Sequence, residues 1–320
     1  MRDYIVESVG GLLDSAEISY VKWDMNRQFA GVSGEFMHRY ILGLYEVLHR
    51  VFDARPQVLL ESCSSGGNRF DLGMLCFSPQ IWASDDTDAV ERLDIQKGLS
   101  YLYPLSAMGA HVSACPNAQT LRRTPMGTRF AVSCFGCLGW ELDLRELTPA
   151  ELREARRQTE FYKKHRMTLQ YGRFYRFELP DGREGFSCVA RDGSEAVTGH
   201  FRRFMQAAPE SQKLPCAGLD TSALYEVESL PPLMRISDFG ALIKHALPVK
   251  LRHDGAVMRT ADKLAGLRQS AEKYRASGAA LMDGIRLGSL FLGTGYDKAL
   301  RLPGDFGSEV YLIRRTGKAK

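Results

Sequence analysis

The sequence has no long hydrophobic run and almost no excess of charge. No apolar stretch approaches the roughly 20 residues that a membrane-spanning helix needs, and the first residues lack the apolar core of a signal peptide. The formal net charge is +4 over 320 residues, with Lys and Arg interspersed among acids, which argues against a surface for nucleic acid. We therefore expect a cytoplasmic protein that binds neither membranes nor nucleic acid.

Cysteine and histidine are few and scattered. Seven cysteines, an odd number in a chain this long, indicate reduced thiols rather than a disulfide framework. Cys134 and Cys137 form one C-x-x-C pair, but a structural zinc site needs two further ligands at matching spacing, and the sequence offers no second pair. We assign no metal site.

What is present is an ordinary globular composition, 44% hydrophobic and 25% charged, with length for two domains. Residues 1–170 alternate strand-like and helix-like segments, which predicts about five β/α units. The expected strands are 18–24, 58–62, 80–84, 109–114 and 138–143, and the expected helices are 2–14, 32–55, 89–103, 119–136 and 148–170. In the second helix, Phe36, Tyr40, Leu44 and Leu48 share one face. Residues 171–320 carry short runs between Gly- and Pro-rich turns, which predicts an antiparallel β-sandwich.

Polar residues gather where three of the expected strands end, at Asp24, at 63–69 and at 85–88. Because the carboxyl ends of parallel strands meet at one edge, these side chains should lie close together. Two carboxylates facing each other across a pocket can hydrolyse a glycosidic bond. Two alternatives stay open: the acids cap helices, or residues 85–88 bind a divalent cation although the spacing is not that of an EF-hand.

Three segments resemble the active-site motifs of glycoside hydrolase family 36 α-galactosidases, in the family's order. They are Lys22-Trp23-Asp24-Met25-Asn26-Arg27, Glu61-Ser62-Cys63-Ser64-Ser65-Gly66-Gly67-Asn68-Arg69-Phe70-Asp71 and Trp82-Ala83-Ser84-Asp85-Asp86-Thr87-Asp88. The resemblance implies that Asp24 is the nucleophile and Asp85 the general acid and base, with Asp86 as the competing choice. It further implies sugar contacts by the residues Lys22, Asn26, Cys63 and Gly66, and a pocket wall, or plain core packing, at Trp82.

The implied function is retaining hydrolysis of terminal α-D-galactosides of the melibiose and raffinose type, without a cofactor, by a homo-oligomer in its full-length form. An α-N-acetylgalactosaminidase and a transglycosylase are variants of the same chemistry. The family's enzymes are longer and have a complete eight-stranded barrel. We therefore expect residues 1–170 to be the second portion of a (β/α)8 barrel, 171–320 the carboxyl-terminal β-domain, and the isolated chain to be incomplete. The alternative is a non-catalytic or sugar-binding remnant or subunit that needs an upstream partner.

Overall fold

The computed structural model describes residues 1–318 apart from 180, 208, 210–211, 215, 244–251, 253–254, 265 and 294. The chain divides into two compact units, one of Met1–Asp86 with Leu99–Gly109 and one of Thr87–Gly98 with Ala110–Lys320. Among the residues described, no helix has the length and apolar character needed to cross a bilayer.

The first half of the chain contributes one five-stranded sheet in the order β1-β2-β3-β4-β5. Its strands are β1 (Tyr20–Trp23), β2 (Leu59–Ser62), β3 (Gln80–Trp82), β4 (Met108–Ser113) and β5 (Cys137–Glu141). The pairs β1–β2, β2–β3 and β3–β4 are parallel, with Trp23 opposite Ser62 and Ser62 opposite Ile81. This is the predicted partial (β/α)8 barrel, in which sequential strands are neighbours and their carboxyl ends share one edge.

Helices alternate with these strands. The sequence predicts five of them, and the four-residue helix between β2 and β3 is an addition. The helices are α1 (Arg2–Asp14), α2 (Gly34–Phe52), α3 (Leu72–Leu75), α4 (Ala89–Leu99), α5 (Met126–Ser133) and α6 (Pro149–Tyr171), with short 3-10 turns η1 (Leu105–Ala107) and η2 (Leu144–Glu146). Helix α5 is shorter than the predicted 119–136, because the Asn117 side chain accepts the backbone N–H groups of Gln119 and Thr120 and holds that stretch as a turn. The predicted capping box of α6 is present, since Thr148 Oγ1 accepts the Glu151 N–H at 3.2 Å.

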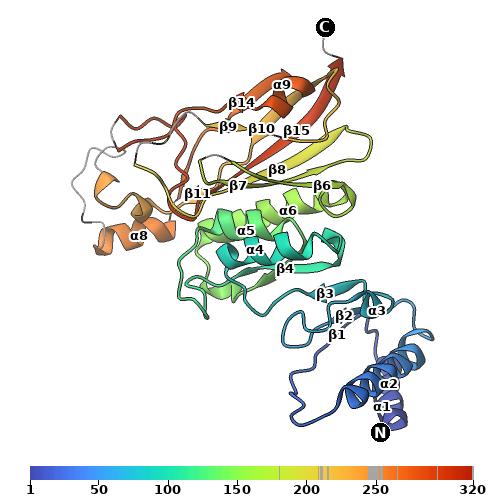
Figure 1. Ribbon diagram of the computed structural model, residues 1–320. Helices are drawn as coiled ribbons and strands as arrows, with labels where there is room; N and C mark the ends of the chain where they lie inside the picture. The colour runs from blue at the N-terminus through green and yellow to red at the C-terminus, as the bar shows by residue number, and fades with distance from the viewer. Residues whose placement is uncertain are drawn as a thin grey trace. The chain divides into compact units, whose positions relative to one another are not determined.

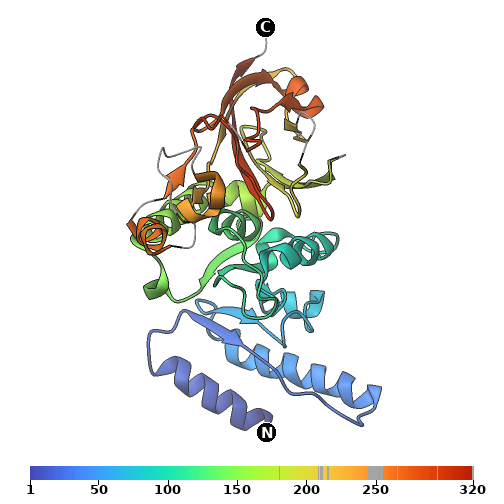
Figure 2. The same ribbon diagram turned by 90° about the vertical axis from the view of Figure 1, so that its left-hand side faces the viewer.

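Helices α1 and α2 lie side by side in both views (Figures 1 and 2). Arg50 Nη1 lies 2.8 Å from Asp3, and Arg55 Nη2 lies 2.6 Å from Asp14. The predicted face of α2 is only partly right. Leu44 and Leu48 are buried, but Phe36 is 44% exposed because it packs against the loop residue Phe29, at 5.5 Å between ring centroids, instead of the core.

The second half is built on a six-stranded antiparallel sheet in the order β13-β10-β15-β8-β7-β6. Its strands are β6 (Arg173–Glu178), β7 (Glu184–Val189), β8 (Glu195–Phe201), β10 (Ala223–Ser229), β13 (Lys273–Ser277) and β15 (Ser308–Lys318). Helix α6 runs along β7 and β8 (Figure 1). The smaller elements are β9 (Lys213–Leu214) with β14 (Ile285–Arg286), β11 (Leu233–Met234) with β12 (Leu267–Arg268), η3 (Ile236–Leu242), α8 (Ala256–Leu264) and α9 (Gly278–Asp283). The sequence did not predict the two α-helices.

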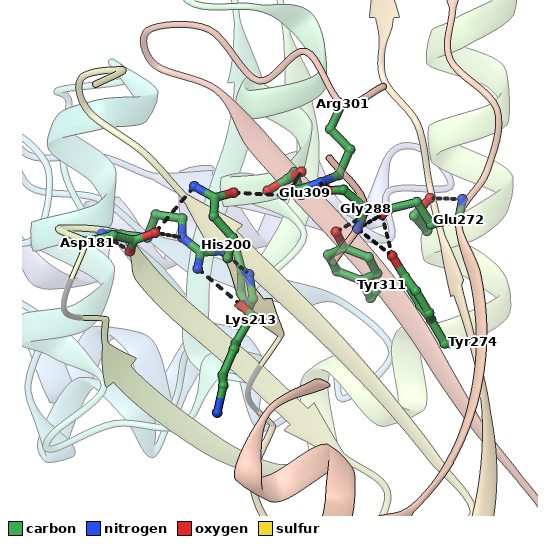
Figure 3. Close-up of polar contacts among 12 residues, drawn as sticks. Asp181, His200, Lys213, Glu272, Tyr274, Gly288, Arg301, Glu309 and Tyr311 are labelled. Carbon is green, nitrogen blue, oxygen red and sulfur yellow. Dashed lines mark hydrogen bonds and ion pairs between the residues drawn. The ribbon is translucent and has the colours of Figure 1, made fainter. Parts of the chain in front are cut away.

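A buried polar network ties this second sheet to the loops beside it (Figure 3). Its centre is Arg301, which is 4% exposed. Its guanidinium donates to Gly288 O at 2.9 Å and to Gln212 Oε1 at 3.0 Å, and it also pairs with Glu309 of β15. The Arg301 charge is therefore neutralised and hydrogen-bonded inside the domain, as a buried charge must be.

The same network continues on both sides of Arg301. On one side, Gln212 Nε2 donates to Asp181, whose carboxylate also accepts from buried Arg183 at 2.7 Å. On the other side, the Glu272 carboxylate accepts the Gly288 N–H and the Tyr311 hydroxyl, each at 2.9 Å. Segments that lie far apart in the sequence are therefore joined by charge-assisted hydrogen bonds.

Candidate active site

Asp24 directly follows β1, and its carboxylate is surrounded by hydrogen-bond donors. Oδ1 accepts the Met25 N–H at 2.7 Å, and Oδ2 accepts the Asn26 amide at 3.2 Å. The Cys63 thiol, at the end of β2, forms a third hydrogen bond with it. Asp24 does not cap the next helix, because the N-cap of α2 is Ser33, whose hydroxyl accepts the Phe36 N–H. The helix-cap alternative therefore fails for Asp24.

These donors control the charge of Asp24. Burial alone would raise the pKa of the carboxyl, but the three hydrogen bonds and the nearby Lys22 ammonium outweigh it and hold the pKa below its usual range. Asp24 is therefore ionised at neutral pH. A carboxylate that must attack an electrophilic carbon has to be ionised in this way.

Lys22 lies one strand position before Trp23 and is held from two sides. Its Nζ lies 3.6 Å from the carboxylate of Glu61, the residue opposite it on β2. It also lies 4.8 Å from the centre of the Trp82 ring on β3, a cation–π geometry. Lys22 therefore spans the ends of three neighbouring strands.

Asp85 follows β3 and is joined to the same group of residues. Its Oδ1 accepts the Trp82 indole N–H at 3.0 Å. A Cβ on Gly66 would lie 2.9 Å from the Asp85 backbone nitrogen, and Gly66 has φ of +83°, so only glycine suits this turn. The loop after β2 thus reaches the backbone of the loop after β3.

Asn26 fixes that loop from the other side. Its Oδ1 accepts both the backbone N–H of Ser65, at 3.1 Å, and the Ser65 hydroxyl, at 3.0 Å. Ser65 has φ of +45°, a left-handed conformation that is costly for a residue with a side chain. The Asn26 hydrogen bonds hold it there.

The structure thus brings the seven predicted site residues into one connected group within the first compact unit. Direct contacts run from Asp24 to Cys63 and Asn26, and from Lys22 through Trp82 to Asp85. Asp86 lies beside Asp85, and its backbone N–H donates to Ser84 Oγ. Asp88 is not part of this group. It is 1% exposed, accepts the Val90 N–H in the first turn of α4 and pairs with Arg122 at 2.8 Å.

The sequence alone assigned no role to Glu61, which in the structure contacts the site residue Lys22. It is 2% exposed, pairs with Lys22, and accepts hydrogen bonds from the Tyr20 hydroxyl and from Gln80 Nε2 at 3.1 Å. A signal was available in the sequence. A single acid inside the apolar run 58–62 must find a partner when it is buried.

The rate at which the Cys63 thiol is alkylated tests this geometry. Burial, together with the Asp24 charge, raises the pKa of its thiol to about 11. We therefore expect iodoacetamide at pH 8 to alkylate the exposed Cys76 and to leave Cys63 largely unmodified in the folded chain. Peptide mapping by mass spectrometry measures both sites, and alkylation of Cys63 as fast as of Cys76 would contradict this arrangement.

Chemically, this edge of the sheet offers an ionised carboxylate, a second carboxylate held by an indole N–H, and an ammonium group. In the described part of the chain, no three His, Cys, Asp or Glu side chains form a group that could hold a metal ion. The two carboxylates and the ammonium group suit acid–base and nucleophilic chemistry.

Comparisons with known proteins point to the same chemistry. The Melibiase family model matches residues 1–172, and the model of the glycosyl hydrolase family 36 C-terminal domain matches residues 185–313. α-Galactosidase AgaA of Geobacillus stearothermophilus is 46% identical over 239 residues, which cover 71% of this chain and 33% of that protein.

Solved structures give the same picture over nearly the whole chain. The α-galactosidase of Lactobacillus brevis matches with a TM-score of 0.76 and 33% identity, covering 100% of this chain and 38% of that one. A variant of AgaA in complex with raffinose matches with a TM-score of 0.75 and 35% identity, covering 98% of this chain and 38% of that one. The chain spans between 33% and 38% of the length of these relatives. It belongs to glycoside hydrolase family 36, the family of these α-galactosidases.

Proposed function

We propose that this chain carries the catalytic carboxylates of a retaining α-galactosidase that acts on terminal α-D-galactosides of the melibiose and raffinose type. The observation that carries the proposal is the hydrogen-bonded, ionised Asp24 in one contact group with Asp85. The names of the relatives support the reaction, and the raffinose complex of the AgaA variant supports the substrate class.

In the proposed mechanism, Asp24 attacks the anomeric carbon while Asp85 donates a proton to the leaving oxygen. The glycosidic bond breaks and a covalent galactosyl ester of Asp24 forms. Asp85, now ionised, removes a proton from water, the water oxygen attacks the anomeric carbon, and the ester bond to Asp24 breaks. The Trp82 indole N–H favours Asp85 over Asp86 as the acid and base, because it orients the Asp85 carboxylate.

The side chains around Asp24 and Asp85 would position the substrate. Lys22 and Asn26 would bind galactose hydroxyls, Cys63 and Gly66 would line the pocket, and Trp82 would form one wall. Glu61 keeps Lys22 in place, because the ion pair and the Trp82 ring restrict its ammonium from two directions. No cofactor takes part.

The described sheet has five strands in the order β1 to β5, whereas a closed barrel of this class has eight. We infer that the catalytic cavity is completed by polypeptide outside these 320 residues, and that the complete enzyme is a homo-oligomer. The second candidate, a sugar-binding subunit without activity of its own, rests on the same five-stranded sheet.

Release of p-nitrophenol from p-nitrophenyl α-D-galactoside separates these candidates. The assay is run on the purified chain alone and on the chain with the upstream part of AgaA supplied as a second polypeptide. We expect little turnover alone and turnover with the added segment. No turnover under either condition, together with saturable binding of melibiose, would favour the sugar-binding subunit.

The pH dependence of the active form tests the Cys63–Asp24 hydrogen bond. In Cys63→Ala the carboxylate loses a donor, so the pKa of Asp24 rises, and the acidic limb of kcat/KM should move to higher pH by about half a unit to one unit. Cys63→Ser is the matched control, because its hydroxyl can still donate. An acidic limb that does not move in Cys63→Ala would show that this bond does not set the ionisation of Asp24.

A further inference from the structure

A pocket of about 310 Å³ lies entirely within the second compact unit. Its walls come from the loop before α5, the first turn of α6, and the residues around the start of η3. Three arginines line it, namely Arg123, Arg129 and Arg235. This concentration of guanidinium groups contrasts with the nearly balanced charge of the chain as a whole.

Arg129 is the fixed member of the three. It is 5% exposed, and its Nε donates to Thr124 O at 3.2 Å while Nη1 donates to Ser113 O. The hydrogen bonds that its guanidinium makes to described residues use Nε and Nη1, which leaves Nη2 available as a donor in the pocket that Arg129 lines. Burial also lowers the pKa of the guanidinium, because its charge has lost part of its hydration. An anion in the pocket would accept a hydrogen bond from Nη2 and add to the negative charge of Glu151, which already acts on Arg129.

Two carboxylates also line the pocket, and both already have partners. Glu151 accepts from Arg235 Nη2 at 2.6 Å and from the Thr148 N–H at 2.9 Å, as part of the α6 capping box. Asp238 accepts the backbone N–H of Arg235 at 2.9 Å. Because Arg235 neutralises Glu151, the remaining charges are the two positive charges of Arg123 and Arg129 and the one negative charge of Asp238. The pocket therefore has a net positive charge of one.

The start of α5 adds to this positive character. Pro125 is its N-cap, Pro125 and Met126 line the pocket, and the hydrogen bonds of the helix begin with the Thr128 and Arg129 N–H groups donating to Pro125 O. The first N–H groups of a helix and its dipole favour an anion. The helix end, the buried guanidinium and exposed Arg123 therefore act on the same space.

We propose that this pocket binds a small phosphate-bearing molecule, with its oxyanion held by Arg129 Nη2 and the Arg123 guanidinium. A guanidinium N–H is a strong, charge-assisted hydrogen-bond donor to phosphate oxygens. The pocket is larger than a phosphate group, which leaves room for an organic part. This site is independent of galactoside hydrolysis, because its ligand is an anion whereas the galactosides are uncharged.

Isothermal titration calorimetry of the full 320-residue chain with inorganic phosphate tests the site, at constant ionic strength in a buffer free of other oxyanions. We expect saturable binding with one ligand per chain. Arg123→Gln should weaken it by about tenfold or more, because it removes one charge-assisted hydrogen bond. Arg156→Gln, a change at an arginine that is 82% exposed on α6 and outside this pocket, should leave the affinity unchanged.

A second variant tests the role of the buried Arg129. Arg129→Lys keeps the positive charge but removes the Nη2 donor, so it should also weaken phosphate binding. Circular dichroism verifies that the variant is folded. Acetate is titrated in parallel, because equal affinity for acetate would identify a carboxylate ligand and overturn the phosphate assignment. Absence of saturable binding to the intact chain, or binding that Arg123→Gln does not weaken, would overturn the proposal.

Discussion

Asp24→Asn is expected to lower α-galactoside hydrolysis by at least about 10⁴-fold in any form of this chain that turns over, because the amide cannot attack the anomeric carbon. The amide keeps the shape of the carboxylate but loses its charge, and only its oxygen can still accept one of the hydrogen bonds that Met25 N–H and the Asn26 amide donate to Asp24. The measurement is the rate of p-nitrophenol release, with the substrate affinity determined separately.

Asp53→Asn is the matched control for this change. Asp53 is a surface residue after α2 that pairs with His49, and its loss should leave the rate unchanged. Mass spectrometry of the active form with a slowly hydrolysed 2-fluoro galactoside should add one galactosyl group at Asp24. Full activity of Asp24→Asn, or labelling at another residue, would overturn the assignment of the nucleophile.

Arg301→Met is expected to destabilise the second half of the chain by about 3–5 kcal/mol, because it leaves the partly buried Glu309 and Glu272 carboxylates without their cation. Gln212 and the carbonyl of Gly288 lose donors as well. Urea unfolding followed by far-UV circular dichroism measures the effect. Hydrogen exchange at β15 verifies that it acts in this domain.

Arg315→Met is the control, in β15, the strand that also carries Glu309. Its guanidinium lies 3.9 Å from Asp220, and both side chains are more than one-third exposed, so the loss should be within about 1 kcal/mol. In the double variant Arg301→Met with Glu309→Gln, the second change removes a stranded charge and should recover part of the stability. Equal destabilisation by Arg301→Met and Arg315→Met would show that the buried network contributes little.

The sequence predicted the order of strands and helices in the first half and the edge at which the polar residues meet. This succeeded because local patterns carry that information: apolar runs end in Asp24, Cys63 and Asp85, and parallel strands align their ends. The residues at which strands begin and end were predicted less exactly. The run 18–24 pairs only over Tyr20–Trp23, because Asp24 turns its carboxylate back onto the Met25 N–H.

The contacts that tune the site were beyond sequence reasoning. The Glu61–Lys22 ion pair depends on the register between β1 and β2, and the Trp82–Asp85 hydrogen bond depends on side-chain direction. In the second half, the pattern of short runs predicted antiparallel strands. It could not reveal that Arg183, Gln212 and Arg301 belong to one network, because hydrogen bonds across such sequence distances follow from tertiary packing alone.

The network around Arg301 also limits how this domain can change over evolutionary time. Removing Arg301 alone leaves acids of two other segments without their cation. Removing Glu309 alone leaves the buried Arg301 with only the more distant Glu272 carboxylate, at 3.7 Å. Substitutions here should therefore be accepted together or not at all. In a collection of related sequences, we expect positions 272, 301 and 309 to covary, with apolar replacements appearing at all three at once, while exposed pairs such as Arg315 and Asp220 drift independently.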